Sequence, residues 1–332
     1  LALVAGKECL WFDPVERKFA KGPDMSVERG LHTATALLDG RILLACGVNY
    51  TNDPQDSLEV FDPVQGICIP LAATARDKRS PHSASGLPDG RVLLAGGISD
   101  MNGMLQALGS IVATTDLFDP VQNSVSKGPD LATPRVAHLA AKLPDGRILL
   151  AGGASWRSVL FIKIPYFSDS SDLFDPATGK ITAGPTMKVA RGFGSSLWLK
   201  NGKLLVVGGA SGDLSQLGAP TAACELFDPA TGLFAATGSL AAPRAAAALF
   251  LLPDGRVLAA GGMQGDLFNP LALTSSELYD PATGAWSPGP PLGAGRTGAF
   301  VALLPDGTLL LLGGASAGPN GTAQDTGELF HP

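Results

Sequence analysis

Residues 143–153 read LPDGRILLAGG, and this stretch with its variants decides the fold. Its second half is an apolar run that ends in glycine, and the chain contains it seven times, as LALVAG at 1–6, ILLACG at 42–47, VLLAGG at 92–97, ILLAGG at 148–153, LLVVGG at 204–209, VLAAGG at 257–262 and LLLLGG at 309–314. Successive closing glycines are 41, 50, 56, 56, 53 and 52 residues apart. Such a period indicates propeller blades rather than helical solenoid repeats.

Composition fits many short strands joined by tight turns. Apolar residues make up 45% of the 332-residue chain and charged residues 16%, with 42 glycines and 26 prolines. The net charge of −6 comes from scattered residues, and no basic stripe follows the chain, which argues against a nucleic-acid partner. No run of about 18 apolar residues occurs, so we expect no transmembrane segment.

Each repeat predicts four strands, a to d. The first half of the opening stretch, Leu-Pro-Asp-Gly-Arg, is a turn between apolar runs, and Asp-Gly or Asn-Gly at such a place is a strong hairpin signal. Strands a and b are therefore expected to form a hairpin. A loop of variable length follows strand b, and strand c ends at Phe-Asp-Pro, because proline cannot donate to a ladder and aspartate favours turns.

These motifs together resemble the Kelch-repeat β-propeller of the bacterial, galactose-oxidase-like central-domain type. The resemblance covers the whole chain and rests on the Gly-Gly pairs, the LPDGR turns, the ELFDPATG segment at 225–232 and Trp286 after Gly284. It implies an all-β, single-domain β-propeller of four-stranded antiparallel sheets. It says little about activity, because such propellers serve as enzymes, adhesins and adaptor modules.

The chain is thus expected to be one domain, 1–332. Its repeats lie at approximately 1–28, 29–78, 79–134, 135–190, 191–243, 244–295 and 296–332. The first lacks strand a and the last lacks strand d. We predict seven blades. The alternative is six blades with overlapping terminal strands, in which strand a at 296–306 pairs with the first repeat. Incomplete terminal blades could also pair with another chain and form an oligomer.

Function is expected on the rim that carries the b–c loops, which are long in the third repeat (98–115) and fourth repeat (154–171). The run from Val159 to Phe167 holds a single charge and is too apolar for an ordinary exposed loop. Either it is a flap folded over the channel mouth or a neighbouring blade, or it is an exposed patch for a partner. The candidate binding residues are Trp156, Arg157, Phe161, Tyr166, Phe167, Met101, Met104 and Tyr50.

Six repeats place an arginine at the start of strand a and a carboxylate two residues before the aromatic residue of strand c. The arginines are Arg29, Arg79, Arg135, Arg191, Arg244 and Arg296, and the carboxylates are Glu59, Asp116, Asp172, Glu225, Glu277 and Glu328. Strands a and c flank strand b, so each arginine could cross over the glycine pair to its carboxylate. We interpret these residues as structural ion pairs, with a ligand-binding ring of arginines as the alternative.

Three histidines, His32, His82 and His138, follow their arginines by three residues. They are interpreted as packing between neighbouring blades, with a metal set as the alternative. A copper-radical oxidase also needs an aromatic residue before such a histidine, two tyrosines and a Cys–Tyr cross-link; the preceding residues are Leu31, Pro81 and Ala137. The four cysteines are interpreted as small buried apolar residues. No metal or cofactor is predicted.

The leading hypothesis is a non-catalytic binding module that presents its long b–c loops to a protein or carbohydrate. We expect it outside the cytoplasm, in the periplasm, at the cell surface or secreted. A non-redox carbohydrate-active enzyme, an isomerase or lyase at the channel mouth, is the first alternative. A structural or adhesive subunit whose terminal blades are completed by another chain is the second.

Overall fold

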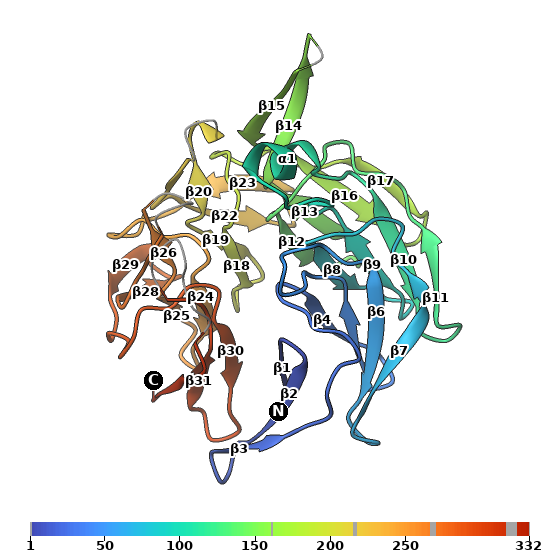
Figure 1. Cartoon of the computed structure of the whole chain (residues 1–332). Coiled ribbons are helices and arrows are strands. Elements are labelled where there is room, and N and C mark those ends of the chain that lie inside the picture. The colour runs from blue at the N-terminus through green and yellow to red at the C-terminus, as the bar shows by residue number, and fades with distance from the viewer. Residues whose placement is uncertain (1, 161, 215–217, 266–269, 317–323, 332) are drawn as a thin grey trace. The chain divides into compact units, whose positions relative to one another are not determined.

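Short antiparallel strands make up nearly all of the regular structure (Figure 1). The computed structural model describes residues 2–160, 162–214, 218–265, 270–316 and 324–331. Within these ranges one helix is present, α1 (Met104–Gly109), and no helix is long and apolar enough to cross a membrane. Each repeat forms a sheet of its own, with strands a to d side by side in chain order. Two compact units can be distinguished.

The first compact unit comprises the chain up to Pro165 together with Asp172–Gly184. Its first sheet has three strands, β1 (Ala2–Ala5), β2 (Glu8–Asp13) and β3 (Lys18–Lys21). The second repeat forms a four-stranded sheet of β4 (Thr33–Ala36), β5 (Ile42–Ala45), β6 (Ser57–Asp62) and β7 (Ile67–Thr74). The third contains β8 (Ser83–Gly86), β9 (Val92–Ala95), β10 (Thr115–Asp119) and β11 (Ser124–Lys127). The fourth contains β12 (Leu139–Lys142), β13 (Ile148–Ala151), β16 (Ser171–Asp175) and β17 (Lys180–Ala183).

The second compact unit comprises Tyr166–Ser171 and the chain from Pro185 onward. The fifth repeat forms a sheet of β18 (Ser195–Trp198), β19 (Leu204–Val207), β22 (Cys224–Asp228) and β23 (Leu233–Ala236). The sixth contains β24 (Ala248–Leu251), β25 (Val257–Ala260), β28 (Ser276–Asp280) and β29 (Ala285–Pro288). The last sheet has three strands, β30 (Phe300–Leu303), β31 (Leu309–Leu312) and β32 (Gly327–Phe330).

The predicted fold class, an all-β, single-domain β-propeller with four-stranded antiparallel sheets, is confirmed by this sheet arrangement. In blade count the structure agrees with the six-bladed alternative rather than with seven four-stranded blades. Five sheets have all four strands, and the two terminal repeats contribute three strands each. The strand at the start of the last repeat, β30, pairs with β31 of that repeat, Phe300 lying opposite Leu312.

The cores lie between neighbouring sheets. Strand b is buried along its length in the third to seventh repeats. One core cluster, for example, joins Leu93 and Ala95 of β9 to Ile148 and Leu150 of β13, with Phe174 of β16. The apolar runs of the opening motif therefore form the centre of each sheet, which leaves the loops at the two rims for function.

The Asp-Gly turns form as the sequence predicts. In the second repeat the amide of Leu37 donates to the carbonyl of Arg41 over 2.8 Å, and Gly40 has a φ of +88°. Glycine adopts this left-handed conformation without the strain that a Cβ would add. The turns fix the register between strands a and b, for example Thr33 opposite Ala45.

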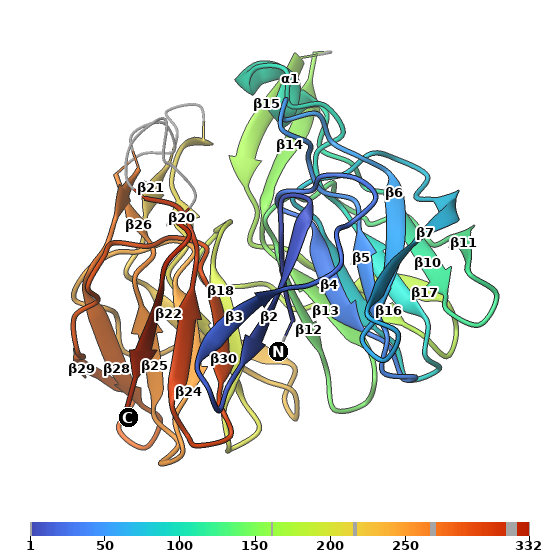
Figure 2. The same cartoon turned by 60° about the horizontal axis from the view of Figure 1, so that its bottom comes forward.

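The b–c loops carry the elements that the repeat does not explain. The third repeat has α1 there, and the fourth has a hairpin of β14 (Ala154–Val159) and β15 (Ile162–Phe167), which we call the arm. Short strand pairs occupy the same loops of the next two repeats, β20 (Ala210–Ser211) with β21 (Ala219–Pro220), and β26 (Met263–Gln264) with β27 (Leu271–Ala272). Figures 1 and 2 show the arm projecting from the first unit with α1 beside its base.

Candidate functional site

The arm becomes steadily more exposed from its base to its tip. Ala154 and Ser155 are buried at the start of β14, whereas Val159 is 43% exposed, Leu160 86% and Ile162 66%. The described side chains at the tip are therefore largely open to solvent. The run was expected to be either a folded flap or an exposed patch, and the described part of its tip has the exposure of the second interpretation.

Two side chains fix the base of the arm to the third repeat. The indole Nε1 of Trp156 donates to the carbonyl oxygen of Ile111 over 3.1 Å, and Lys163 Nζ donates to the carbonyl oxygen of Gly109. The same ammonium group lies 4.0 Å from the centre of the Trp156 ring, a cation–π contact worth about 0.5–1 kcal/mol at an exposed site. An isolated hairpin is marginally stable at best, so these contacts explain how the arm is held at its base.

The other predicted binding residues lie in different environments. Arg157 is exposed on β14, Met101 and Tyr166 are half-buried, and Tyr50 is 80% exposed in the b–c loop of the second repeat. Phe161 and the side chain of Met104 lie outside the described residues.

The assignment of Phe167 to a binding surface needs correction. Its side chain is only 5% exposed, and its ring lies so close to Gly218 that a Cβ there would come within 2.5 Å of the ring. Phe167 therefore belongs to the interior at the end of β15, and the apolar run changes from core to surface along its length.

The structure places each of the six arginines beside the carboxylate of its own repeat. The shortest N–O distances, in chain order, are 2.9, 2.5, 3.0, 2.7, 2.8 and 3.0 Å. All six arginine side chains are at most 2% exposed. A guanidinium group that is buried and already paired offers no donor to a ligand at the surface.

The arginines also cross strand b at the glycine pair. In each repeat Nη1 donates to the carbonyl oxygen of the residue 17 positions later, which is the first member of the pair or Cys46 in its place; the six distances are 3.0, 3.2, 2.8, 2.6, 2.8 and 2.9 Å. The arginine thus ties strands a, b and c together at one end of the sheet, through charge-assisted hydrogen bonds that are stronger than neutral ones.

The glycine pair itself is required by the next repeat. The first glycine has a φ near +60°, as in Gly208 at +57°, and a Cβ there would lie 2.1 Å from the carbonyl oxygen of Arg244. The amide of the second glycine, Gly209, donates to that same oxygen over 2.9 Å. Where Cys46 replaces the first glycine, the corresponding bond from Gly47 to Arg79 lengthens to 3.3 Å. Close approach of the next repeat therefore disfavours a side chain at this position, and Cys46 is accommodated there with a longer bond.

Asp116 is less completely paired than the four glutamates of the set. Each glutamate of the set accepts two backbone amides from the d–a connection as well as the arginine, as Glu225 does from Lys188 and Val189 over 2.7 and 3.0 Å. The shorter Asp116 accepts one such amide, that of Arg76, and its Oδ1 is buried without a hydrogen bond. Burial raises the pKa of Asp116 above its usual value.

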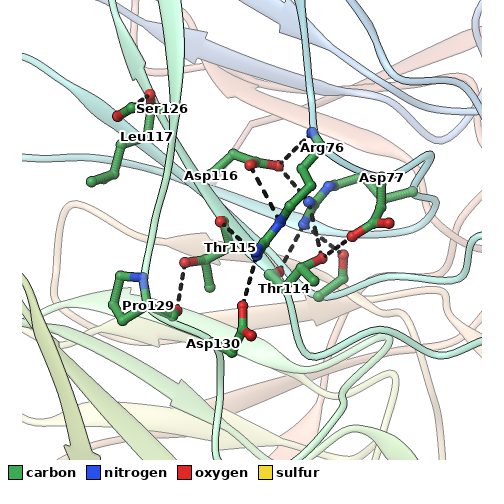
Figure 3. A network of polar contacts seen from close by, with 11 residues as sticks. Arg76, Asp77, Thr114, Thr115, Asp116, Leu117, Ser126, Pro129 and Asp130 are labelled. Carbon is green, nitrogen blue, oxygen red and sulfur yellow. Dashed lines mark hydrogen bonds and ion pairs between the residues drawn. The ribbon is translucent and has the colours of Figure 1, made fainter.

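Figure 3 shows the polar network around Asp116. Asp130 on the far side binds the Arg76 side chain, with 2.7 Å between Nη2 and Oδ1, while Thr114 donates to Asp77 over 2.6 Å. All of these groups come from the second and third repeats. The network therefore has the character of a joint between two repeats, like the other five pairs.

The three histidines lie between neighbouring repeats. His82 Nε2 is 2.9 Å from the hydroxyl of Thr33 in the preceding repeat, and His138 Nε2 is 2.8 Å from that of Ser83. Burial lowers the pKa of His32 and His82, that of His82 well below its usual value, and lowers the pKa of His138 to about 3. They are therefore neutral at pH 7. Across the described ranges, no group of three or more His, Cys, Asp and Glu side chains is placed to hold a metal ion.

Comparison with known proteins identifies relatives by structure alone. No family model matches the chain, and no curated protein matches it in sequence. A fungal alcohol oxidase of the AA5 family, solved in complex with copper, superposes with a TM-score of 0.71 at 20% identity over 93% of this chain. The protein YjhT superposes with a TM-score of 0.67 at 17% identity, over 92% of this chain and 95% of its own. The fold is a Kelch-type β-propeller.

This Kelch-type propeller spans 63% of the length of the fungal oxidase. At 20% and 17% identity the likeness establishes the fold, and activity does not follow from it. The arm, in the b–c loop of the fourth repeat, carries exposed side chains that have no counterpart in the repeated motifs.

Proposed function

We propose that this chain is a non-catalytic binding module whose arm contacts a protein partner. The observation that carries the proposal is the exposure of three aliphatic side chains, Val159, Leu160 and Ile162, at the tip of an arm whose base is fixed. Full burial of such a side chain contributes about 1.5–3 kcal/mol, so a partner with an apolar groove would gain most by enclosing the tip.

The chemistry of the tip supports a protein rather than a carbohydrate partner. A carbohydrate partner would be expected to stack a sugar ring on an exposed aromatic side chain. The Lys163 ammonium group, however, lies over the Trp156 ring, and Phe167 is buried. Tyr50 is exposed, but in the loop of another repeat. Exposed aliphatic groups at the tip of a hairpin suit insertion into an apolar pocket.

The enzyme alternatives have less support. The recurrent arginines are buried in ion pairs, and His82 and His138 are neutral and bonded to hydroxyl groups. A hollow of about 340 Å³ lies among the tight turns and is lined by Leu38, Asp89, Arg91 and Val121, among others, but Arg91 is paired with Asp89 over 2.7 Å. None of these groups is placed as a nucleophile beside a base.

Copper, which the fungal oxidase contains, does not fit the residues described. Two of the three histidines direct Nε2 at a hydroxyl of the preceding repeat, and no carboxylate or thiol joins them in a group that could hold a metal. We derive no redox step for this chain.

A peptide-display experiment tests the proposal. A random peptide library is selected on immobilised wild-type chain, and the affinity of each enriched peptide is then measured by fluorescence anisotropy with wild type, Leu160→Asp and Ile162→Asp. We expect peptides rich in apolar anchors whose Kd rises at least about tenfold with either substitution, because a buried aspartate forfeits the apolar burial and adds a desolvation cost.

Leu233→Asp is the matched control, because Leu233 is another exposed leucine, 64% exposed, on β23 in the second compact unit. It should leave the affinity unchanged. Selected peptides that bind all three variants alike would contradict the proposal. So would a glycan array on which the wild type binds sugars and Leu160→Asp does not, since the partner would then be a carbohydrate.

A further inference from the structure

Two cysteines from different repeats lie in contact. Cys9 is on β2 of the first sheet and Cys68 is on β7 of the second, 59 positions later, and their Sγ atoms are 3.9 Å apart. Both belong to the first compact unit. The motif that brings them together is the repeat itself, which stacks strand c of one sheet beside strand d of the next.

The surroundings hold the two thiols at this distance. Cys9 shares a core cluster with Met25, Leu44 and Phe61, and Cys68 packs against the same cluster from the side. The backbones are fixed too, since Cys9 lies opposite Val4 in β1 and Cys68 opposite Phe61 in β6. Neither sulfur can move far from the other while the two sheets stay packed.

We propose that Cys9 and Cys68 form a disulfide that joins the first sheet to the second when the chain meets a disulfide oxidant. A disulfide needs its sulfurs about 2.05 Å apart, so the pair must approach by roughly 2 Å, which small rotations about the two Cα–Cβ bonds can supply.

The reaction is a two-step exchange with a small disulfide such as oxidised glutathione. Cys68, half-buried, is the accessible thiol; its thiolate attacks one glutathione sulfur, forms a mixed disulfide and releases one glutathione thiolate. The Cys9 thiolate then attacks the Cys68 sulfur and releases the second. Two protein thiols lose two electrons in total, the oxidant becomes two thiols, and those thiols take up the two protons.

Burial sets the rate of this exchange. It raises the pKa of Cys9 to about 12 and also raises that of Cys68, so the thiolates are scarce at neutral pH. Thiolate, not thiol, is the nucleophile, and the bond should therefore form slowly at pH 7 and faster at pH 9. The finished bond closes a loop of about 60 residues and thereby restricts the conformations of the unfolded chain. It also ties the three-stranded terminal sheet to its neighbour in the folded chain.

The test uses the full chain treated with oxidised glutathione at pH 8.5 and then freed of reagent. Free thiols, counted in denaturant, should fall from the four of the sequence to two, and a non-reducing peptide map should link the Cys9 peptide to the Cys68 peptide. The Tm should rise by roughly 5 °C and return to its original value with dithiothreitol.

Cys9→Ala and Cys68→Ala should each abolish the link and the shift in Tm. The matched control is Cys46→Ala with Cys224→Ala, which removes the other two thiols and should leave both the link and the shift intact. Four thiols after oxidation, a mixed disulfide that persists at Cys68, or a link to another cysteine would each overturn the proposal.

Discussion

Replacing Arg191 by methionine should strongly destabilise the fold. Its guanidinium group donates to the carbonyl oxygens of Gly208 and Ala223, each over 2.6 Å, and to Glu225 over 2.7 Å, and its side chain is fully buried. Methionine fills similar space but leaves the Glu225 carboxylate without its cation and removes one hydrogen bond from each of the two carbonyl groups, of which Ala223 still accepts the amide of Gly208 over 3.2 Å. Breaking a buried pair in this way costs about 3–5 kcal/mol, or roughly 5–10 °C in Tm for a chain of this size.

The assay is thermal unfolding followed by tryptophan fluorescence and circular dichroism, with Arg147→Met as the control. Arg147 pairs with Asp145 at a similar distance, 2.7 Å, but both side chains are about half exposed, so its loss should cost less than about 1 kcal/mol. An Arg191→Met chain that melts like the Arg147→Met chain, and loses peptide binding instead, would refute the structural role that we assign to the six arginines.

A double variant tests a finer point of the same reasoning. Replacing a simple buried ion pair by two apolar residues is often neutral. Glu225, however, also accepts the amides of Lys188 and Val189, so Arg191→Met with Glu225→Met removes one hydrogen bond from each of four backbone groups. The double variant should remain at least as unstable as Arg191→Met, and recovery toward wild-type stability would show that these backbone bonds contribute little.

Three further predictions concern the joints between repeats. Burial lowers the pKa of His138 to about 3 in the fold, against about 6.5 in the unfolded chain. Its contribution to the free energy of unfolding is therefore complete above pH 6.5 and is lost as the pH falls, by about 2 kcal/mol at pH 5. The Tm of His138→Asn should accordingly depend less on pH between 5 and 7 than that of the wild type. Gly208→Ala should lower the Tm by several degrees, because its Cβ would meet the Arg244 carbonyl oxygen at 2.1 Å, whereas Gly232→Ala, with positive φ but open space around it, should lower it less. Asp116→Glu should stabilise the chain by about 1 kcal/mol by accepting the second loop amide that the aspartate does not bind, and a lower Tm would show that the site has no room for the added methylene.

Much of the fold was predictable because the same strand and turn motifs occur in repeat after repeat. The Asp-Gly turns, the apolar strand b and the aromatic strand c recur, and each copy supports the same assignment of strands. The proximity of Arg191 to Glu225 also followed from strand order, since strands a and c both flank strand b. Blade count was not decided in this way, because it depends on how the two incomplete terminal repeats are built, and only one copy of each exists.

The arm was harder to predict, for a physical reason. Apolar residues predominate along the whole run from Val159 to Phe167, yet its first end is exposed and its last residue is buried. What separates them is a set of contacts with a distant segment, such as that of Trp156 with Ile111, and no local pattern encodes those. The contact of Cys9 with Cys68 joins strand c of one repeat to strand d of the next, and no motif within a repeat indicates such a pairing.

We propose that the arm, and not the repeat that builds the scaffold, carries the function. Hydrogen–deuterium exchange of the wild-type chain, measured with and without a peptide selected on it, tests that claim most directly. We predict that added protection is confined to residues 156–165 and to the neighbouring α1 loop at 100–111. Protection at the tight turns, such as 37–41 and 87–91, with the arm unchanged, would contradict the account.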